Sequence, residues 1–345
     1  MRAVATCLIL TLGGCVFAGP HYQGPVSDHF DGERFQNQVP TPGSFWSFLR
    51  WQATREPPPW PTSLHLEPAP APPPQVAGAD LRVTWINHST LLLQLDGLNV
   101  LTDPIWSERC SPLSWIGPQR VIPPGVRFED LPRIDAVLIS HNHYDHLDLE
   151  TLRRLQEAHR PRFLVPLGDR PLLEDAGLER VSEHDWWEEV PLGGATRAGF
   201  VPAQHFANRG LTDRDRTLWG GWVLEGPAGL VYFAGDTGWG PQFAQVRERY
   251  GAPRLALLPI GAYAPRWFMA PMHLDPAQAV EAHRVLGAGT SVGIHFGTFP
   301  LADEGRYAPA WELARALHAQ GVPPERFWTL EGGEGRAVPP RPAGP

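Results

Sequence analysis

Short apolar runs rich in Leu, Ile, Val and aromatic residues recur along the chain, and amphipathic stretches lie between many of them. Such runs are typical of strands, whereas apolar positions that repeat every three to four residues indicate helices. From residue 81 to residue 101 three runs follow one another closely, and Asp96-Gly97 between the last two is a strong hairpin signal. The pattern therefore predicts that the folded body begins with three antiparallel strands, at residues 81–86, 90–95 and 98–101.

Strands and helices alternate from residue 134 onward. The predicted strands are residues 134–139, 163–165, 197–202, 218–224, 230–233, 255–260, 291–294 and 326–330. The predicted helices are residues 149–159, 171–176, 276–286 and 309–320. Asp148 is a favourable N-cap for the first of these helices, and Asp275 with Gln278 forms a capping box for the third. This alternation favours an α/β (α+β) fold in which helices cover two facing sheets.

The segments on either side of this body differ in composition. Residues 19–55 are aromatic without a sustained period, and we expect this arm to wrap the core. Residues 57–74 contain nine prolines, too many for a helix or a central strand, so they should be extended and act as a semi-rigid spacer. The Pro-rich residues 336–345 are expected to form a disordered tail. We thus divide the chain into a signal segment (1–15), an arm and linker (16–80), a folded body (81–335) and this tail.

The first 15 residues have the features of a secretion signal. Arg2 precedes an apolar run, and small residues precede Cys15. The run is too short to span a membrane. The sequence Leu12-Gly13-Gly14-Cys15 resembles the bacterial lipobox, which implies that Cys15 becomes a lipid anchor. Plain secretion with cleavage after Ala18, and a cytosolic protein with an apolar start, are the alternatives.

The cysteine count leaves no intrachain disulfide under this interpretation. If Cys7 is removed with the signal and Cys15 is acylated, Cys110 is the single cysteine left. We therefore interpret Cys110 as a packing residue rather than a nucleophile.

Composition and charge narrow the functional classes. At 345 residues with 42% apolar content, the chain can bury a substantial core. The formal charge of −8 gives no basic footprint, so we expect no nucleic acid as a partner. All 29 basic residues are arginine. The absence of lysine excludes a Walker phosphate loop, a Schiff-base lysine and the Ser-x-x-Lys hydrolases, because each needs an ammonium group.

A crowded set of potential metal ligands follows the predicted strand 134–139. Its sequence is Ser140-His141-Asn142-His143-Tyr144-Asp145-His146-Leu147-Asp148. Alternation at the strand end sends His141 and His143 to one side, and the loop returns Asp145 and His146 from another. Neutral imidazole and carboxylate are preferred ligands of zinc-class ions, so two ligand faces suggest two ions. The alternative is a polar, helix-capping loop with incidental histidines.

Further candidates also follow predicted strands. His205 and His295 each come directly after a strand, and glycines flank Asp236 in a turn that lets the backbone approach an ion closely. His88 and Asp103 end the first three-stranded unit, and we expect them at most to support ligands from behind.

Taken together, these residues resemble the metallo-β-lactamase fold, a four-layer αββα sandwich with a His-x-His-x-Asp-His loop. The chain looks most like the N-acylphosphatidylethanolamine-hydrolysing phospholipase D family and its bacterial outer-membrane relatives. The resemblance covers roughly residues 81 to 300. The runs that carry it are residues 101–106, 134–148, 202–205, 218–220, 233–238 and 295–299.

The resemblance implies a site with two Zn²⁺ ions. It assigns one ion to His141, His143 and His205, the other to Asp145, His146 and His295, and the bridge between them to Asp236. Two ions about 3.5–4 Å apart can share a hydroxide at neutral pH and neutralise the attacking and leaving oxygens of a phosphodiester. Water would then be the nucleophile, and Asp145 could orient it.

His273 is our candidate proton donor or phosphate contact, because it matches a histidine in the family's His-x-Asp-Pro run. A capping or solvated loop residue is the alternative. The family pattern has Gln at the position of Met272, so the chemistry can persist with a different substrate.

We therefore expect a zinc-dependent phosphodiesterase of phospholipase D type that hydrolyses phospholipid or N-acylphospholipid head groups with a metal-bound hydroxide. The anchor at Cys15 would hold it at a membrane of the bacterial cell envelope, in the outer membrane or periplasm. The alternatives are a dinuclear-zinc lactonase or other ester or amide hydrolase, and a surface lipoprotein that binds lipid or metal without turnover. The oligomeric state stays open, with a homodimer as one option.

Overall fold

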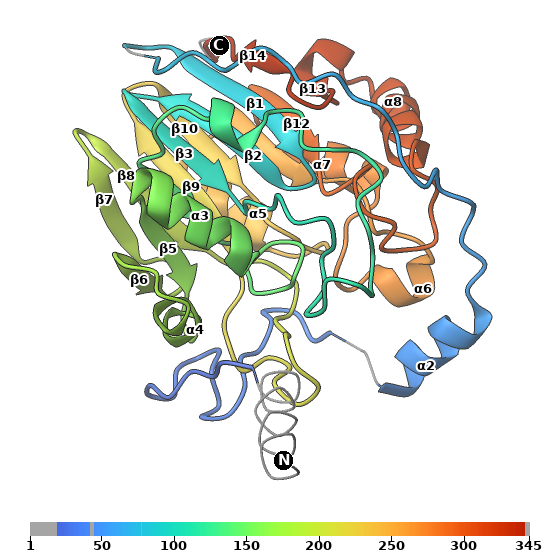
Figure 1. Cartoon of the computed structure of the whole chain (residues 1–345). Coiled ribbons are helices and arrows are strands. Elements are labelled where there is room, and N and C mark those ends of the chain that lie inside the picture. Colours follow the sequence, from blue (N-terminus) through green and yellow to red (C-terminus); the bar gives the residue numbers. More distant parts are fainter. Residues whose placement is uncertain (1–18, 42–44, 77, 342–345) are drawn as a thin grey trace, which may run out of the picture.

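Two seven-stranded mixed sheets pack face to face, and helices cover both outer faces (Figure 1). The computed structural model describes residues 19–41, 45–76 and 78–341. The predicted signal segment, including Cys15, lies outside the described residues. The four-layer α/β sandwich predicted from the sequence is confirmed.

The first sheet has the strand order β14-β1-β2-β3-β4-β5-β6. Its strands are β1 (Leu81–Asn87), β2 (Thr90–Leu95), β3 (Leu98–Thr102), β4 (Ala136–Leu138), β5 (Arg162–Pro166), β6 (Val181–His184) and β14 (Gly335–Ala337). β1, β2 and β3 are antiparallel, as the hairpin signals predict, and β3 to β6 pair in parallel.

The second sheet has the order β13-β12-β11-β10-β9-β8-β7. Its strands are β7 (Glu189–Gly193), β8 (Thr196–Val201), β9 (Gly221–Gly226), β10 (Gly229–Phe233), β11 (Leu255–Pro259), β12 (Thr290–Ile294) and β13 (Phe327–Trp328). β7 to β10 are antiparallel, whereas β10 to β13 are parallel. The strands β8, β10 and β12 therefore run in one direction and end at the same edge of the sheet.

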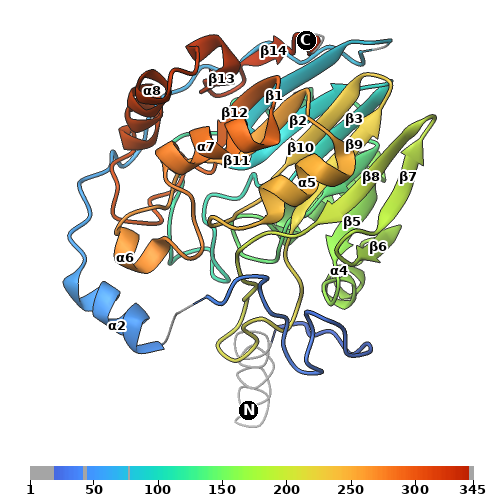
Figure 2. The same cartoon turned by 180° about the vertical axis from the view of Figure 1, so that it is seen from behind.

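Helices α3 (Leu149–His159) and α4 (Arg170–Asp175) lie on the first sheet, and α5 (Gln242–Tyr250), α7 (Pro276–Leu286) and α8 (Ala308–Gln320) cover the second (Figure 2). Two 3₁₀ turns, η1 (Phe128–Asp130) and η2 (Pro324–Arg326), complete the body. The predicted caps are confirmed: Asp148 accepts from the backbone of Glu150, and Asp275 with Gln278 forms a capping box.

The core consists of three apolar layers that match this architecture. The central layer lies between the sheets and includes the fully buried Phe200, Trp219 and Trp222. A second layer lies between the second sheet and its helices, and a third between the first sheet and its helices. Strands buried on both faces explain the nearly continuous apolar runs in the sequence.

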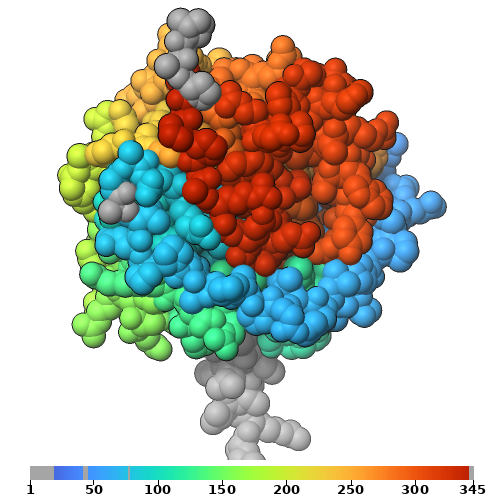
Figure 3. Space-filling view, turned by 90° about the horizontal axis from the view of Figure 1, so that it is seen from above, coloured from blue at the N-terminus to red at the C-terminus, as the bar shows by residue number. Residues whose placement is uncertain are grey.

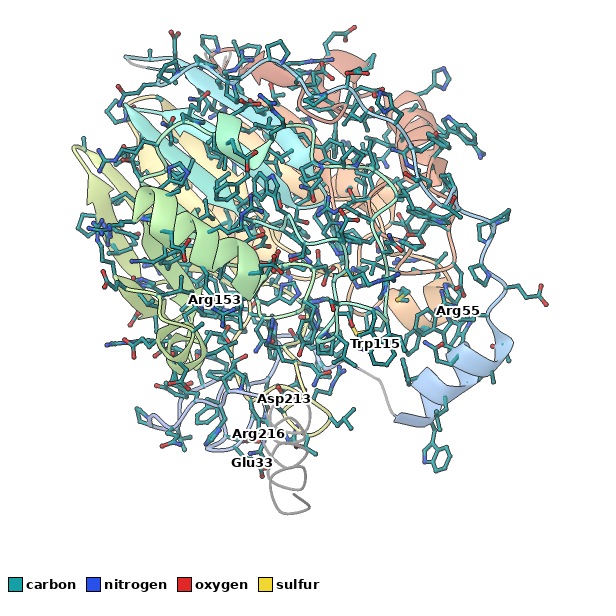
Figure 4. All side chains as sticks on the ribbon, in the orientation of Figure 1. Glu33, Arg55, Trp115, Arg153, Asp213 and Arg216 are labelled. Atoms are coloured by element: carbon teal, nitrogen blue, oxygen red, sulfur yellow. The ribbon has the colours of Figure 1, made fainter. Side chains whose placement is uncertain are left out.

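The aromatic arm packs into the body, as predicted. Phe30 and Phe35 are buried in the central layer, and Glu33 pairs with Arg216 at 2.8 Å (Figure 4). The expectation of an irregular arm is wrong at its end, where α2 (Phe45–Thr54) forms. This helix packs on α6 (Arg266–Met269), with Trp51 stacked on Phe268 at 4.9 Å between ring centroids.

The Pro-rich segment is extended but lies along the body rather than holding it at a distance (Figure 3). Trp60 donates to the carbonyl of Glu304, and the backbone of Leu64 donates to Val121. Residues 336–339 also differ from the predicted disordered tail, because Arg336 is part of β14 and Val338 is buried. These residues are held by long-range contacts that local composition does not reveal.

Candidate metal centre

The predicted metal loop connects β4 to α3. Its backbone turns tightly, since the amides of His146 and Leu147 both donate to the carbonyl of His143. His141 and His146 are buried, whereas His143 and Asp145 are partly exposed. The loop therefore presents ligands to the interior while one side stays accessible.

The second sheet supplies the other three candidates from neighbouring strand ends. His205, Asp236 and His295 follow β8, β10 and β12, which all run in the same direction. Gly235, just before Asp236, has a φ of +60°, and a Cβ there would lie 2.7 Å from the Cβ of Ser140. Only glycine allows the two sheets to approach this closely beside the metal loop.

One histidine group forms where the loop meets β8. The Nε2 atom of His141 lies 2.8 Å from Nδ1 of His143, and Nε2 of His205 lies 3.4 Å from the same atom. Three imidazole nitrogens thus converge on one small volume.

A second group forms around Asp145. Its Oδ2 atom lies 3.3 Å from Nε2 of both His146 and His295. Ligands about 2.0–2.2 Å from a tetrahedral ion lie roughly 3.3–3.5 Å apart, so these separations suit two ligands of one ion.

Asp236 lies between the two groups. Its Oδ2 atom is 2.9 Å from Nε2 of His295 and 3.3 Å from Nε2 of His146. The same oxygen is 3.8 Å from Nε2 of His205, a member of the first group. All seven predicted ligands therefore lie together, and Asp236 reaches both sets.

The hydrogen bonds behind these histidines orient them as metal ligands. Ser140 Oγ donates to Asp103 at 2.5 Å, so it accepts from Nδ1 of His141 at 2.9 Å. Nδ1 of His146 donates to Asp103 at 2.6 Å, and Nδ1 of His205 donates to the carbonyl of Met272 at 3.0 Å. In each case Nε2 is the nitrogen that faces the cluster, which is the arrangement that metal-binding histidines require.

Unpaired buried atoms agree with this assignment. Within the described part of the chain, Nε2 of His146 and Oδ1 of Asp236 are buried without a hydrogen-bond partner. Buried polar atoms left without a partner are costly, so these atoms fit ligands of a cation. The residues present therefore fit a metal centre.

Burial controls the charge of the first group. It lowers the pKa of His143 to about 3 and holds the pKa values of His141 and His205 well below their usual range. These imidazoles are neutral at physiological pH, the form that binds metal.

In the second group, the negative carboxylates and the positive histidines balance one another's charge. Burial lowers the pKa of His295, but Asp236 and Asp145 outweigh this effect and raise it to about 9. Burial raises the pKa of Asp236, but His295 and His146 outweigh this effect and hold it well below its usual range. Carboxylates and imidazoliums thus neutralise one another until a cation replaces the protons.

Asp103, His88 and His273, which are not among the seven predicted ligands, also lie at the site. Asp103 accepts from Nδ1 of His146 at 2.6 Å, and Nε2 of His88 lies 3.0 Å from Oδ2 of Asp145. Nδ1 of His273 lies 3.9 Å from Oδ2 of Asp236, and burial lowers its pKa to about 4. The role of His273 stays a prediction.

Sequence reasoning missed the residues that hold the loop in place. The guanidinium of Arg209 donates to the carbonyls of Asn142 and Leu147 at 2.9 and 2.8 Å and lies over the ring of Tyr144. An arginine in an irregular segment carries no sequence signal for such a contact.

The Cys110 side chain is buried beside Ile105 and Phe299. Its interpretation as a packing residue agrees with this position.

A two-sheet sandwich with a histidine and aspartate cluster at its strand ends is the architecture of the metallo-β-lactamase superfamily. The family model described as "Beta-lactamase superfamily domain" matches residues 98–296, more than half of the chain. The chain belongs to this superfamily, and its homologues include N-acyl-phosphatidylethanolamine-hydrolyzing phospholipases D.

Three curated relatives illustrate the range of the family. The chain is 44% identical to an uncharacterized protein of Mycobacterium tuberculosis over 70% of its length and 65% of that protein, so it spans less than two thirds of this relative. It is 38% identical to N-acyl-phosphatidylethanolamine-hydrolyzing phospholipase D 1 of Caenorhabditis elegans, over 74% of this chain and 75% of the relative. It is 31% identical to a UPF0173 metal-dependent hydrolase of Methanopyrus kandleri, over 65% of this chain and 87% of the relative.

Solved structures share the fold. A metallo hydrolase from Ignicoccus hospitalis superposes with a TM-score of 0.56 at 24% identity, over 75% of this chain and 98% of that one.

Proposed function

We propose that this chain is a zinc-dependent phosphodiesterase of phospholipase D type that hydrolyses the head group of phospholipids or N-acylphospholipids. The observation that carries the proposal is the position of Asp236, whose Oδ2 lies 2.9 Å from His295 and 3.8 Å from His205. One carboxylate within reach of both histidine groups suits a bridge between two ions. The name of the Caenorhabditis elegans relative supports the phospholipid substrate.

In this proposal, His141, His143 and His205 would hold one ion, Asp145, His146 and His295 would hold the other, and Asp236 would be shared. Two such ions lower the pKa of water and neutralise charge on attacking and leaving oxygens. No serine or cysteine nucleophile is then needed. The protein's own part is to hold the ligands and to keep Asp145 at the partly exposed side, where it can orient the attacking water.

In this proposal, His273 serves the leaving group. It lies between α6 and α7, and its backbone carbonyl accepts from Arg266 at 2.8 Å. Its ring packs against His205 and His295, with centroids at 5.1 and 5.4 Å. A histidine here can contact the phosphate or pass a proton to the departing oxygen.

We further propose that the chain works at a membrane surface of the bacterial cell envelope, with Cys15 as its lipid anchor. Within the described residues no helix is long and apolar enough to cross a membrane. The neighbouring helices α2 and α6 expose large apolar side chains, namely Trp46, Phe48, Leu49 and Trp267. Tryptophans in such a position are suited to the membrane interface.

A substrate panel tests the proposal. Purified protein loaded with zinc should release phosphatidic acid from N-acylphosphatidylethanolamine, and removal of metal with a chelator should abolish the release. Activity on lactones or amides, with none on any phosphodiester in the panel, would establish the alternative hydrolase instead.

A further inference from the structure

His88 occupies the first position of the two-residue turn between β1 and β2. Its φ is +44°, in the left-handed region that hairpin turns usually fill with Gly, Asn or Asp. Residues with a Cβ seldom adopt this conformation, although histidine does so more often than most, so contacts of His88 must hold it there.

The structure fixes the position of His88 from several sides. Its amide donates to Oγ1 of Thr298 at 2.9 Å, and its carbonyl accepts from the backbone of His295 at 3.1 Å. Its ring packs between His295 and Phe299, with centroids at 4.2 and 5.4 Å. These contacts connect the first-sheet turn to the end of β12 in the second sheet.

The direction of the ring is specific. Nε2 of His88 lies 3.0 Å from Oδ2 of Asp145, a normal hydrogen-bond length. His146 and His295 are 3.3 Å from the same oxygen and also contact Asp236. Among the described residues, the carboxylate contact of His88 is with Asp145 alone. The ligand atoms of His88, Asp145, His146 and His295 all lie within 4.8 Å of one another. Within the described residues, His88 is the histidine of this group that does not contact Asp236.

We propose that His88 is a positioning residue: its Nε2–H donates to Asp145 and holds that carboxylate in the orientation in which it binds the second metal ion. The inference rests on the proposed metal centre, but its test needs no substrate. Loss of a hydrogen-bond partner behind a metal ligand typically weakens metal binding about 10- to 100-fold.

Two variants separate the role in the turn from the role of the ring. His88→Asn suits the left-handed backbone, but its amide is too short to reach Asp145. His88→Gln places an amide nitrogen near the position of the imidazole Nε2. The measurements are the metal bound per chain in competition with a chelator, the visible spectrum of the cobalt-substituted protein, and the melting temperature of the metal-free protein.

Compared with the wild type, we expect His88→Asn to bind the ion assigned to Asp145, His146 and His295 about 10- to 100-fold more weakly. The melting temperature of its metal-free form should be unchanged or higher. His88→Gln should retain both metals and the wild-type cobalt spectrum. Wild-type affinity in His88→Asn would overturn the inference. Metal loss in His88→Gln equal to that in His88→Asn, or an altered cobalt spectrum in His88→Gln, would also overturn the inference, because His88 would then be a metal ligand itself. A wild-type protein that binds no metal would overturn the proposed function first.

Discussion

Three residues at or beside the candidate site have a backbone conformation that is unfavourable for residues other than glycine. His88, Asp103 and His295 have φ values of +44°, +33° and +59°, all in the left-handed region that residues other than glycine seldom adopt. Each of them contacts a candidate ligand or is one. Such strain persists only where surrounding contacts enforce it, which is typical of functional sites. The sequence reveals the ligand types but not this strain, because φ at these positions is set by contacts between the sheets.

At this scale, His273→Gln tests the role of the histidine before α7. If His273 acts as a proton donor, the variant should keep its bound metal while kcat for phospholipid hydrolysis falls about 10²- to 10⁴-fold. Metal analysis together with steady-state kinetics measures both quantities. Metal loss in the variant would show instead that His273 is a ligand.

Asp169 gives a prediction on pH. It is fully buried, accepts from Nδ2 of Asn142 at 3.0 Å, and burial raises its pKa to about 8. The folded state therefore keeps a proton that the unfolded chain loses above pH ~4, so this residue reduces stability as pH rises from about 4 to about 8.

Asp169→Asn should remove this effect. The free energy of unfolding of the variant, relative to wild type, should increase with pH by at most about 1.4 kcal/mol per unit and level off above pH ~8. Urea denaturation between pH 5 and 9 measures it, with Asp175→Asn on the exposed side of α4 as the control. A difference independent of pH would contradict the prediction.

At the scale of elements, the sequence predicts what local signals determine. The hairpins and the caps of α3 and α7 are confirmed because their turn and capping residues act within a few positions. Helices α2, α5 and α6 and strands β6, β7 and β14 were not predicted. Of these, α2 and β14 depend on distant partners. Trp51 of α2 stacks on Phe268, and residues 335–337 of β14 pair with residues 82–84 of β1.

The arm offers a matched pair of substitutions. Phe35 is 2% exposed in the central core layer, whereas Val26 on the same arm is 68% exposed. Phe35→Ala should reduce the free energy of unfolding by about 3–5 kcal/mol. Val26→Ala should change it by less than about 0.5 kcal/mol. Equal effects in chemical denaturation would show that the arm is not an integral part of the body.

At the scale of the whole molecule, the candidate site belongs to both sheets. The loop after β4 supplies four of the ligands, and strand ends of the second sheet supply His205, Asp236 and His295. The sequence places each of these after a strand. Their meeting across two sheets follows from the resemblance to a known fold and not from any local pattern.

The proposed membrane surface has a matched control on another part of the molecule. Trp46 on α2 is 75% exposed, and Trp311 on α8 is 69% exposed. Helix α8 lies well away from α2 (Figure 1). Trp46→Ser should weaken binding to phospholipid vesicles about tenfold, since loss of an inserted side chain costs on the order of 1.5 kcal/mol. Trp311→Ser should leave vesicle binding unchanged in a sedimentation assay. Equal effects of the two substitutions would contradict the proposed surface.

The most direct test of the account is anomalous diffraction at the zinc edge from crystals grown with zinc. We predict two peaks. One should be bounded by His141, His143 and His205 and the other by Asp145, His146 and His295, with Asp236 in contact with both. A single peak, or peaks away from these residues, would contradict the two-metal centre.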